Sequence, residues 1–446
     1  MTRFPYRSRD ERFATSNAMH VQYCQLYYQR LIALGARARA SERARASDGE
    51  LESETNARKM RTVLELVENE RCVVIGTMYK HMKRKPGILD EYVKAAKDGK
   101  EDEGETHDRE GTYTSADDWL ELEDESARLR VIGLDASKFV TGVVVACEGR
   151  AVRGDFVCEG EVMTPQARIR ERKCANGGQD AFIVLVSGFE IDADDVEGGM
   201  RRQMFVDFIT GACGDDDDLD MSSKICRVVV AGGTMKRSEA TDDDGTAAAR
   251  TLKEFDATLT ELVSAVAVDV MSGKSDPSNQ AMPQQKLHPV YFPQASRYES
   301  ALHAVTNPHD FTIGETSFLG TSGQNVEDVL KCSDLGDEVS STFMGDDAAK
   351  RAVVALKATL RWQHIAPSAP DTLACYPFKD RDPFVIETTP DVYFAGCQDA
   401  FGCERVLHPG GGETMVISVP KFSITGTVLL VNVSTLHVTP MTFECS

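Results

Sequence analysis

The sequence predicts a multidomain chain of mixed α+β and α/β class, in which an N-terminal helix precedes a small β-barrel and a larger α/β sandwich. The 446 residues suffice for two or three domains of roughly 100–200 residues each. Short β-branched segments separated by glycines fill residues 58–161, a pattern typical of an antiparallel barrel. From residue 179 onward, apolar strands alternate with an amphipathic helix, which indicates a mixed sheet covered by helices.

The balance of charge excludes some classes of protein. The chain carries 71 Asp+Glu against 50 Lys+Arg, a net charge of −21. A surface this acidic repels phosphate, which argues against a free-standing nucleic-acid binder. No apolar run approaches the roughly 20 residues that cross a bilayer, and the first thirty residues lack the apolar stretch of a signal peptide. The twelve cysteines show no C-x-x-C spacing. We therefore expect an intracellular, soluble protein with reduced thiols and no membrane partner.

Residues 1–45 form the one basic stretch, with nine arginines against three acidic residues. Within it, apolar residues recur at i, i+3 and i+4 and predict an amphipathic helix over 15–34. The small, polar and charged residues that follow, 35–57, predict exposed chain, and we assign 46–57 as the linker. An arginine-rich arm can touch nucleic acid or serve as an import signal, but a solvated arm is the simpler interpretation.

Residues 58–178 predict a small antiparallel barrel, for which the OB-fold is a good candidate. Its strand-like segments are RCVVIGTMYK (71–80), RLRVIGLD (128–135), FVTGVVVACEG (139–149) and DFVCEGEVM (155–163). The segment 97–125 holds thirteen acidic residues against three basic ones and predicts a loop insertion. Binding of single-stranded DNA needs a basic groove and stacking aromatic residues. Since KHMKRK (80–85) is the only basic cluster, we favour protein docking as the role of this barrel.

Residues 179–446 predict one large α/β sandwich. Three continuous apolar strands of the type buried on both faces of a sheet are predicted at 181–188, 225–233 and 268–273. The segment RQMFVDFIT (202–210) is an apolar element of uncertain type. Helices are predicted at 246–266 and 348–361, and strands at 391–397, 413–420, 427–434 and 436–444. The last three strands are expected to form an antiparallel meander.

Five glycine-containing loops follow these strands, at the edge where α/β folds bind ligands. They lie at 186–189, 231–234, 272–276, 320–325 and 394–398. Their order is similar to that of the metal-bearing loops in calcineurin-like phosphoesterases, whose active members carry Asp and His ligands for two metals. The matching positions hold Ser187-Gly188-Phe189, Gly232-Gly233, Gly273-Lys274-Ser275 and Gly396-Cys397-Gln398. The required Asp and His residues are absent there, and Lys274 is expected to place a positive charge where a cation would bind.

The other candidate groups show no catalytic pattern. Histidines without metal-ligand spacing are His288, His303, His309, His364, His408 and His437. Ser187 is not in a G-x-S-x-G motif, and Gly232-Gly233-Thr234 lacks the lysine of a P-loop. Cys397 and Cys403 lack the second pair of thiols of a zinc knuckle. We therefore assign no catalytic residue, no metal ligand and no cofactor-binding residue, and we expect no cofactor.

Four longer sequence segments resemble those of a known protein family. They are DVMSGKSDPSNQAMPQQKLHPVYFPQA (269–295), VTNPHDFTIGETSFLGTSGQNVEDVL (305–330), HIAPSAPDTLACYPFKDRDPFVI (364–386) and VYFAGCQDAFG (392–402). On these strings the chain resembles the small (B) subunits of eukaryotic DNA polymerase delta. Upstream, RCVVIGTMYK and LDASKFVTGVVVACEG are similar to the OB barrel of that family. The acidic insertions at 97–125, 215–220 and 333–347 depart from it.

The resemblance implies an OB domain followed by an inactivated phosphodiesterase domain, without enzymatic activity of its own. It implies a scaffold in DNA replication and repair synthesis, which binds the cysteine-rich C-terminal domain of the catalytic subunit and a third, elongated subunit. Metal or iron–sulfur centres then belong to the partner, and DNA is reached only through the complex. A nuclear location follows, and the helix at 15–34 is expected to pack against the phosphodiesterase domain.

Two other functions stay open. The chain could be an active metal-dependent phosphodiesterase or nuclease, by analogy of fold alone. It could also be the small subunit of polymerase alpha or epsilon, although the strings GTSGQN and APDTLACYPF favour delta. The docking surfaces are equally open. The proline-rich loops 282–293 and 366–378 carry four aromatic residues, which either meet partners or fasten the loops to their own domain: Tyr291, Phe292, Tyr376 and Phe378.

Overall fold

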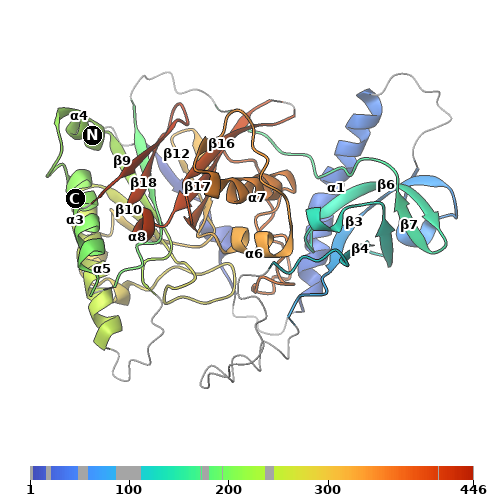
Figure 1. Ribbon diagram of the computed structural model, residues 1–446, viewed down its shortest axis with the longest axis horizontal. Helices are drawn as coiled ribbons and strands as arrows, with labels where there is room; N and C mark the ends of the chain where they lie inside the picture. Colours follow the sequence, from blue (N-terminus) through green and yellow to red (C-terminus); the bar gives the residue numbers. More distant parts are fainter. Residues whose placement is uncertain are drawn as a thin grey trace.

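The computed structural model describes residues 4–16, 22–48, 59–86, 112–170, 172, 180–192, 194–236, 246–409 and 411–444. Three β-sheets organise these residues (Figure 1). One sheet forms a barrel at one end of the molecule, and the other two form a larger body covered by helices (Figure 1). A search of the described helices finds none with the length and apolar character needed to span a bilayer.

The barrel has the strand order β2-β3-β4-β5-β7-β6, and pairing of β3 with β6 closes it. Its strands are β2 Lys59–Arg61, β3 Arg71–His81, β4 Trp119–Glu123, β5 Arg128–Ile132, β6 Val144–Val152 and β7 Asp155–Cys158. Strand β4 corrects the prediction of an unbroken loop over 97–125. Leu120 and Leu122 are buried in the barrel core, so alternation of apolar and polar residues outweighs the acidic composition. The part of that insertion at 97–111 lies outside the described residues.

The first sheet of the larger body has the order β11-β10-β9-β8-β18-β19. Its strands are β8 Phe182–Val186, β9 Ile225–Ala231, β10 Ala267–Met271, β11 Leu302–Val305, β18 Thr427–Asn432 and β19 Val438–Thr442. Strands β8 to β11 are parallel, as the continuous apolar runs predict. Helices α3 Val196–Thr210 and α5 Thr246–Ala265 cover its outer face (Figure 1). The short helix α4 Asp216–Ser223 lies between them in the chain, and α8 Phe422–Thr425 directly precedes β18. The apolar element of uncertain type is thus part of α3.

The second sheet has seven strands in the order β1-β12-β13-β15-β17-β16-β14. They are β1 Tyr6–Ser8, β12 His309–Ile313, β13 Thr316–Thr321, β14 Met344–Gly345, β15 Val392–Gln398, β16 Gly402–Leu407 and β17 Glu413–Pro420. Helices α6 Gln324–Cys332 and α7 Lys350–Arg361 cover its outer face. The inner faces of the two sheets meet in a shared core that includes Leu185, Phe318 and Phe394. The predicted meander is wrong, because β17 belongs to this sheet and β18 to the other.

The N-terminal residues are not a solvated basic arm. Residues 6–8 form β1, which pairs antiparallel with β12 at the edge of the seven-stranded sheet. Arg9 and Arg12 both form ion pairs with Asp310. Phe13 is fully buried in the core. Arg9 and Arg12 therefore neutralise a carboxylate of the same chain, a contact that local sequence does not reveal.

The first helix is longer and later than predicted. Helix α1 spans Cys24–Asp48 and continues through sequence that we predicted to be an exposed linker. Its buried residues explain the difference: Ala38 packs against Val73 and Ala146 of the barrel, and Leu34 packs against Val144 and Val385. Burial of small residues against a barrel stabilises a helix that short-range signals alone do not define. The helix lies at the joint between the barrel and the larger body rather than on the larger body alone (Figure 1).

Candidate functional site

The five predicted loops meet at one place. The backbone N–H of Gly188 donates to the carbonyl of Gly232 at 2.9 Å, which joins the loops after β8 and β9. The backbone N–H of Cys397 donates to the hydroxyl of Ser187 at 2.8 Å, which joins the loop after β15 of the other sheet. We call the loops 186–189, 231–234, 272–276, 320–325 and 394–398 together the loop cluster. The sequence predicted its members correctly because the carboxyl ends of parallel strands share an edge.

Backbone fills the centre of the loop cluster. A Cβ atom added at Gly273 would lie 2.5 Å from the amide nitrogen of Gly233, and one added at Gly396 would lie 2.3 Å from the carbonyl oxygen of Ala231. A Cβ at Gly323 would lie 2.2 Å from the carbonyl oxygen of Gly396. Glycine is required at these positions because the loops approach backbone to backbone. At these three positions the loops therefore meet without side chains between them.

One carboxylate is buried in the loop cluster, and it holds the loops together. Asp276 accepts hydrogen bonds from the backbone N–H groups of Gly233 at 3.0 Å, Thr234 at 2.8 Å and Gly273 at 2.6 Å, and also from the Thr234 hydroxyl. Burial raises the pKa of Asp276 above its ordinary value, although these donors offset part of the effect. Its oxygens point at donors of its own chain, so Asp276 acts as a fastener between loops.

Neutral side chains complete the cluster. The amide of Asn307 donates to the hydroxyl of Ser322 at 2.6 Å and to the side-chain oxygen of Gln284 at 2.9 Å. The Ser187 hydroxyl donates to the carbonyl of Pro420 at 3.0 Å, so its proton is directed at backbone instead of a general base. Burial raises the pKa of the Cys397 thiol to about 12, which keeps it protonated and a poor nucleophile. Satisfied, neutral groups of this kind stabilise a fold and supply no general acid or base.

The expectation for Lys274 is wrong. Its side chain is 56% exposed and its ammonium pairs with Glu327 of α6 at 2.9 Å. The charge is therefore neutralised at the surface and does not enter the loop cluster. Nowhere among the described residues do three or more His, Cys, Asp or Glu side chains form a group that could hold a metal ion.

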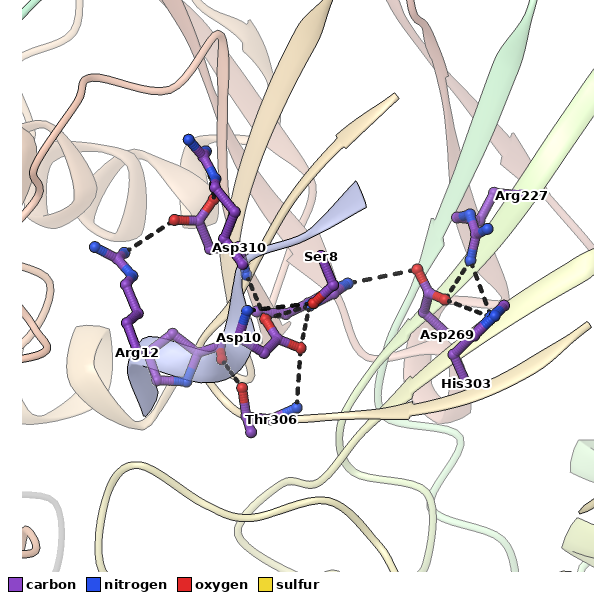
Figure 2. Close-up of polar contacts among 11 residues, drawn as sticks. Ser8, Asp10, Arg12, Arg227, Asp269, His303, Thr306 and Asp310 are labelled. Atoms are coloured by element: carbon purple, nitrogen blue, oxygen red, sulfur yellow. Dashed lines mark hydrogen bonds and ion pairs between the residues drawn. The ribbon is translucent and has the colours of Figure 1, made fainter. Parts of the chain in front are cut away.

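A second cluster, which the sequence did not predict, lies where the N-terminal segment meets both sheets (Figure 2). The buried ring of His309 contacts Asp10 through Nδ1 at 2.8 Å and Asp269 through Nε2 at 3.4 Å. Asp269 also forms an ion pair with Arg227, and Nδ1 of His303 lies 3.3 Å from its carboxylate. The sequence did contain one signal of this cluster: Asp269 and Arg227 are opposite charges within the apolar strands β10 and β9, which pair with each other.

The charges of this cluster stabilise one another. Burial alone would lower the pKa of His309, but the carboxylates of Asp10 and Asp269 outweigh burial and raise it to about 9. Burial alone would raise the pKa of Asp269, but hydrogen bonds from His303 and His309 and the charge of Arg227 hold it well below its usual range. An imidazolium held between two carboxylate side chains is typical of a structural ion network, and both His309 and Asp269 are fully buried.

A third polar cluster joins α1 to both parts of the molecule. The fully buried guanidinium of Arg30 pairs with Asp382 at 2.7 Å and donates to the carbonyls of Pro367 at 2.6 Å and Gly142 at 3.2 Å. Gly142 belongs to the barrel, whereas the other two residues belong to the larger body. His364 lies 2.9 Å from the same carboxylate. Burial and the charge of Arg30 lower the pKa of His364 to about 4, so its ring is neutral.

The aromatic residues of the proline-rich loops mostly face their own domain. Phe292 and Phe378 are buried. The Tyr376 ring packs edge-on against Phe378 at 5.0 Å, and its hydroxyl bonds to the backbone of Ser16. Of the two alternatives that the sequence left open, the structure favours fastening of the loops over display of these rings to a partner.

Comparisons with known proteins agree with these two parts of the chain. A family model described as the DNA polymerase delta subunit OB-fold domain matches residues 22–160, which include α1 and the barrel. A model that describes the B subunit of DNA polymerase alpha/epsilon matches residues 183–403 of the larger body. The predicted OB-fold is thereby confirmed, followed by a B-subunit domain in a chain of mixed α and β structure.

Relatives extend the likeness over most of the chain. A protein of Oryza sativa subsp. japonica named DNA polymerase delta small subunit is 35% identical over 397 residues, covering 86% of each chain. One of that name from Arabidopsis thaliana is 35% identical over 98% of this chain and 95% of its own length. One from Saccharomyces cerevisiae is 31% identical over 84% of this chain and 80% of its own length. The chain therefore belongs to the family of DNA polymerase delta small subunits.

Proposed function

We propose that this chain is a non-catalytic accessory subunit of the DNA polymerase delta complex. It acts as a scaffold that binds the cysteine-rich C-terminal domain of the catalytic subunit and a third subunit, during replication and repair synthesis in the nucleus. Family membership, at 35% identity over most of the chain, supports the role as a delta subunit and disfavours polymerase alpha or epsilon. DNA is then contacted through the complex and not by this acidic chain alone.

The observation that carries the non-catalytic part is the closed loop cluster. We infer that the larger body, 179–446, is a calcineurin-like phosphodiesterase domain that has lost its two-metal site, with the packed loop cluster in its place. Two sheets packed face to face between helices support this fold. Hydrolysis in such a fold requires two metals, a bridging carboxylate and space for a water. The close glycine contacts and the fastened carboxylate of Asp276 in the loop cluster support the loss of that site.

The division into domains follows from the same reasoning. We propose an OB domain over 58–178 and a phosphodiesterase-like domain over 179–446, joined by the N-terminal segment. Helix α1 packs on the barrel, and the family model for the OB domain begins at residue 22. Strand β1 belongs to the larger body. The described parts of this segment, 4–16 and helix α1, therefore support a role in tying the two domains together instead of forming a separate arm.

The test is co-expression of the full chain with the C-terminal cysteine-rich domain of the polymerase delta catalytic subunit from the same organism. Light scattering during size-exclusion chromatography should show a stable 1:1 complex. A chain that stays monomeric beside that domain would contradict the scaffold role. In parallel, the purified chain should hydrolyse no bis(p-nitrophenyl) phosphate with Mn²⁺ present. Turnover that depends on Mn²⁺ and follows the chain through purification would instead favour an active phosphodiesterase.

A further inference from the structure

An apolar groove of about 920 Å³ lies at the junction of the barrel and the larger body. On the barrel side its wall includes Phe139 and the segment 161–167. On the other side its wall includes the outer face of α7 and the end of β16. Exposed apolar surface of this extent at a junction of domains is a common place for a partner to bind.

The outer face of α7 presents an ordered row of side chains to the groove. Val354, Ala358 and Arg361 follow the spacing i, i+4 and i+7 and line the groove, whereas Val353 and Leu356 of the same helix are in the core. Residues at this spacing form a ridge on one face of a helix. The small side chain of Ala358 lets another helix approach closely, as in ridge-into-groove packing. Leu407, the last residue of β16, also lines the groove, and its side chain is 75% exposed.

The charge at the groove is the opposite of the charge of the chain. Lys138 and Arg361 line it; the Lys138 ammonium donates to the carbonyl of Asp334 at 2.7 Å, and its charge also acts on the nearby carboxylate of Asp135. Among the described residues, Arg361 has no hydrogen bond or ion pair. Lys357 is neutralised by Glu404 at 2.7 Å, and Glu161 is the acidic side chain of the lining. A partner with carboxylates beside its apolar face would complement this rim.

Buried bonds between the domains hold the groove open. The guanidinium of Arg37 on α1 donates to the carbonyl of Gln166 at 2.7 Å and to the carbonyl of Ile386 at 2.8 Å. The ammonium of Lys80 on β3 donates to the carbonyl of Cys332 at 2.7 Å. Because both contacts cross from one domain to the other, the two walls keep a set distance. A preformed groove loses little entropy when it binds.

We propose that this groove binds an amphipathic helix of another subunit of the polymerase delta complex, with an apolar face and acidic residues on its flanks. The apolar face packs on Val354, Ala358 and Leu407, and the carboxylates meet Lys138 and Arg361. This is the helix-in-groove mode of recognition. The inference rests on the proposed function, because it takes the occupant from that complex.

The experiment uses the complex reconstituted from this full chain and the other polymerase delta subunits of the same organism. A photo-reactive amino acid is placed at Leu407 and, as a control, at Leu64, which is 73% exposed on the barrel. We expect residue 407 to cross-link to an acidic amphipathic helix of another subunit and residue 64 to give no such product. Ala358→Glu and Leu407→Asp should each weaken assembly at least tenfold, whereas Leu64→Asp should leave it unchanged.

The outcomes separate the two proposals. If the complex assembles but Ala358→Glu and Leu407→Asp bind like the wild type and position 407 gives no cross-link, the groove assignment is wrong and the proposed function stands. A cross-link from 407 to a second copy of this chain also overturns it. If the wild-type chain assembles with no other subunit, the proposed function itself fails. Leu407→Asp changes a surface residue, so it reports on docking even if Ala358→Glu perturbs α7.

Discussion

The Nδ1 atom of His309 lies 2.8 Å from the carboxylate of Asp10, a residue 299 positions earlier in the chain. Asp10 also accepts a hydrogen bond from the backbone N–H of Asp310 at 3.0 Å. Through these contacts the N-terminal segment becomes an edge of the seven-stranded sheet. Residues 4–16 are therefore part of the folded body, and changes in them should affect stability before they affect any partner.

Asp10→Asn should destabilise the chain by about 3 kcal/mol, because it leaves the buried imidazolium of His309 with a weaker partner. The free energy of unfolding in urea measures the effect. Glu11→Gln, next in sequence but exposed, is the matched control and should change it by less than about 0.5 kcal/mol. Equal effects of the two substitutions would show that Asp10 does not anchor the segment.

His309 should make stability fall on the alkaline side. Its pKa in the folded state is raised to about 9, above the roughly 6.5 of an unfolded chain. Between these values the folded state holds a proton that the unfolded state has lost, so this contribution is complete below about pH 6.5 and disappears as pH rises through 9. Unfolding in urea at several pH values should show the slope, and His309→Gln should flatten it. An unchanged slope in that variant would contradict a charged His309.

His364 should act in the opposite direction. Burial and the charge of Arg30 lower its folded-state pKa to about 4. Between about pH 4 and 6.5 the unfolded chain binds a proton that the folded chain does not, so this contribution is present above pH 6.5 and is lost as pH falls. His364→Gln should reduce the loss of stability over this interval by about 1.4 kcal/mol per pH unit at most. The measurement is the unfolding free energy of the variant and of the wild type at each pH; subtracting one from the other cancels the contribution of the carboxylates that both proteins share.

Arg30→Ala should loosen the joint between the domains. It removes a buried guanidinium that pairs with Asp382 and reaches carbonyls of both domains, at a cost of about 3–5 kcal/mol. Calorimetry should show the single transition broaden or split as the domains unfold separately. Arg39→Ala changes an exposed arginine of the same helix and should leave the transition unchanged. A split transition in both variants would point to α1 in general rather than to Arg30.

Gly233→Ala tests whether the loop cluster is filled. A Cβ there would lie 2.7 Å from the Cys397 sulfur and 3.0 Å from Cα of Gly188, and the backbone φ is +67°. Gly154→Ala is the matched control, because φ is +88° but no atom lies within 4 Å of its Cβ. The control should cost about 1 kcal/mol from backbone strain alone. Gly233→Ala should cost at least about 2 kcal/mol more, since packed backbone must move. Equal Tm values for the two variants would indicate open space among the loops.

Local patterns were enough for much of the fold. The apolar runs of β8, β9 and β10 and the amphipathic pattern of α5 predicted those elements, because burial on a sheet or on one helix face leaves a periodic trace. The five loops were correctly grouped, since strand direction places them on one edge. Segments whose pattern is ambiguous were not resolved. Strand β4 is short and lies in acidic sequence, and α1 continues through a run rich in Ala, Arg and Ser.

The sequence by itself determined the order of the two domains, the family, and the absence of Asp and His ligands from the loops after the strands. Tertiary structure alone decided that Asp10 meets His309, that Arg30 joins two domains, and that glycines close the loop cluster backbone to backbone. The physical reason is that periodicity records how each segment is buried. The partner of a buried charge, by contrast, is set by the packing of segments hundreds of residues apart, which leaves no local trace.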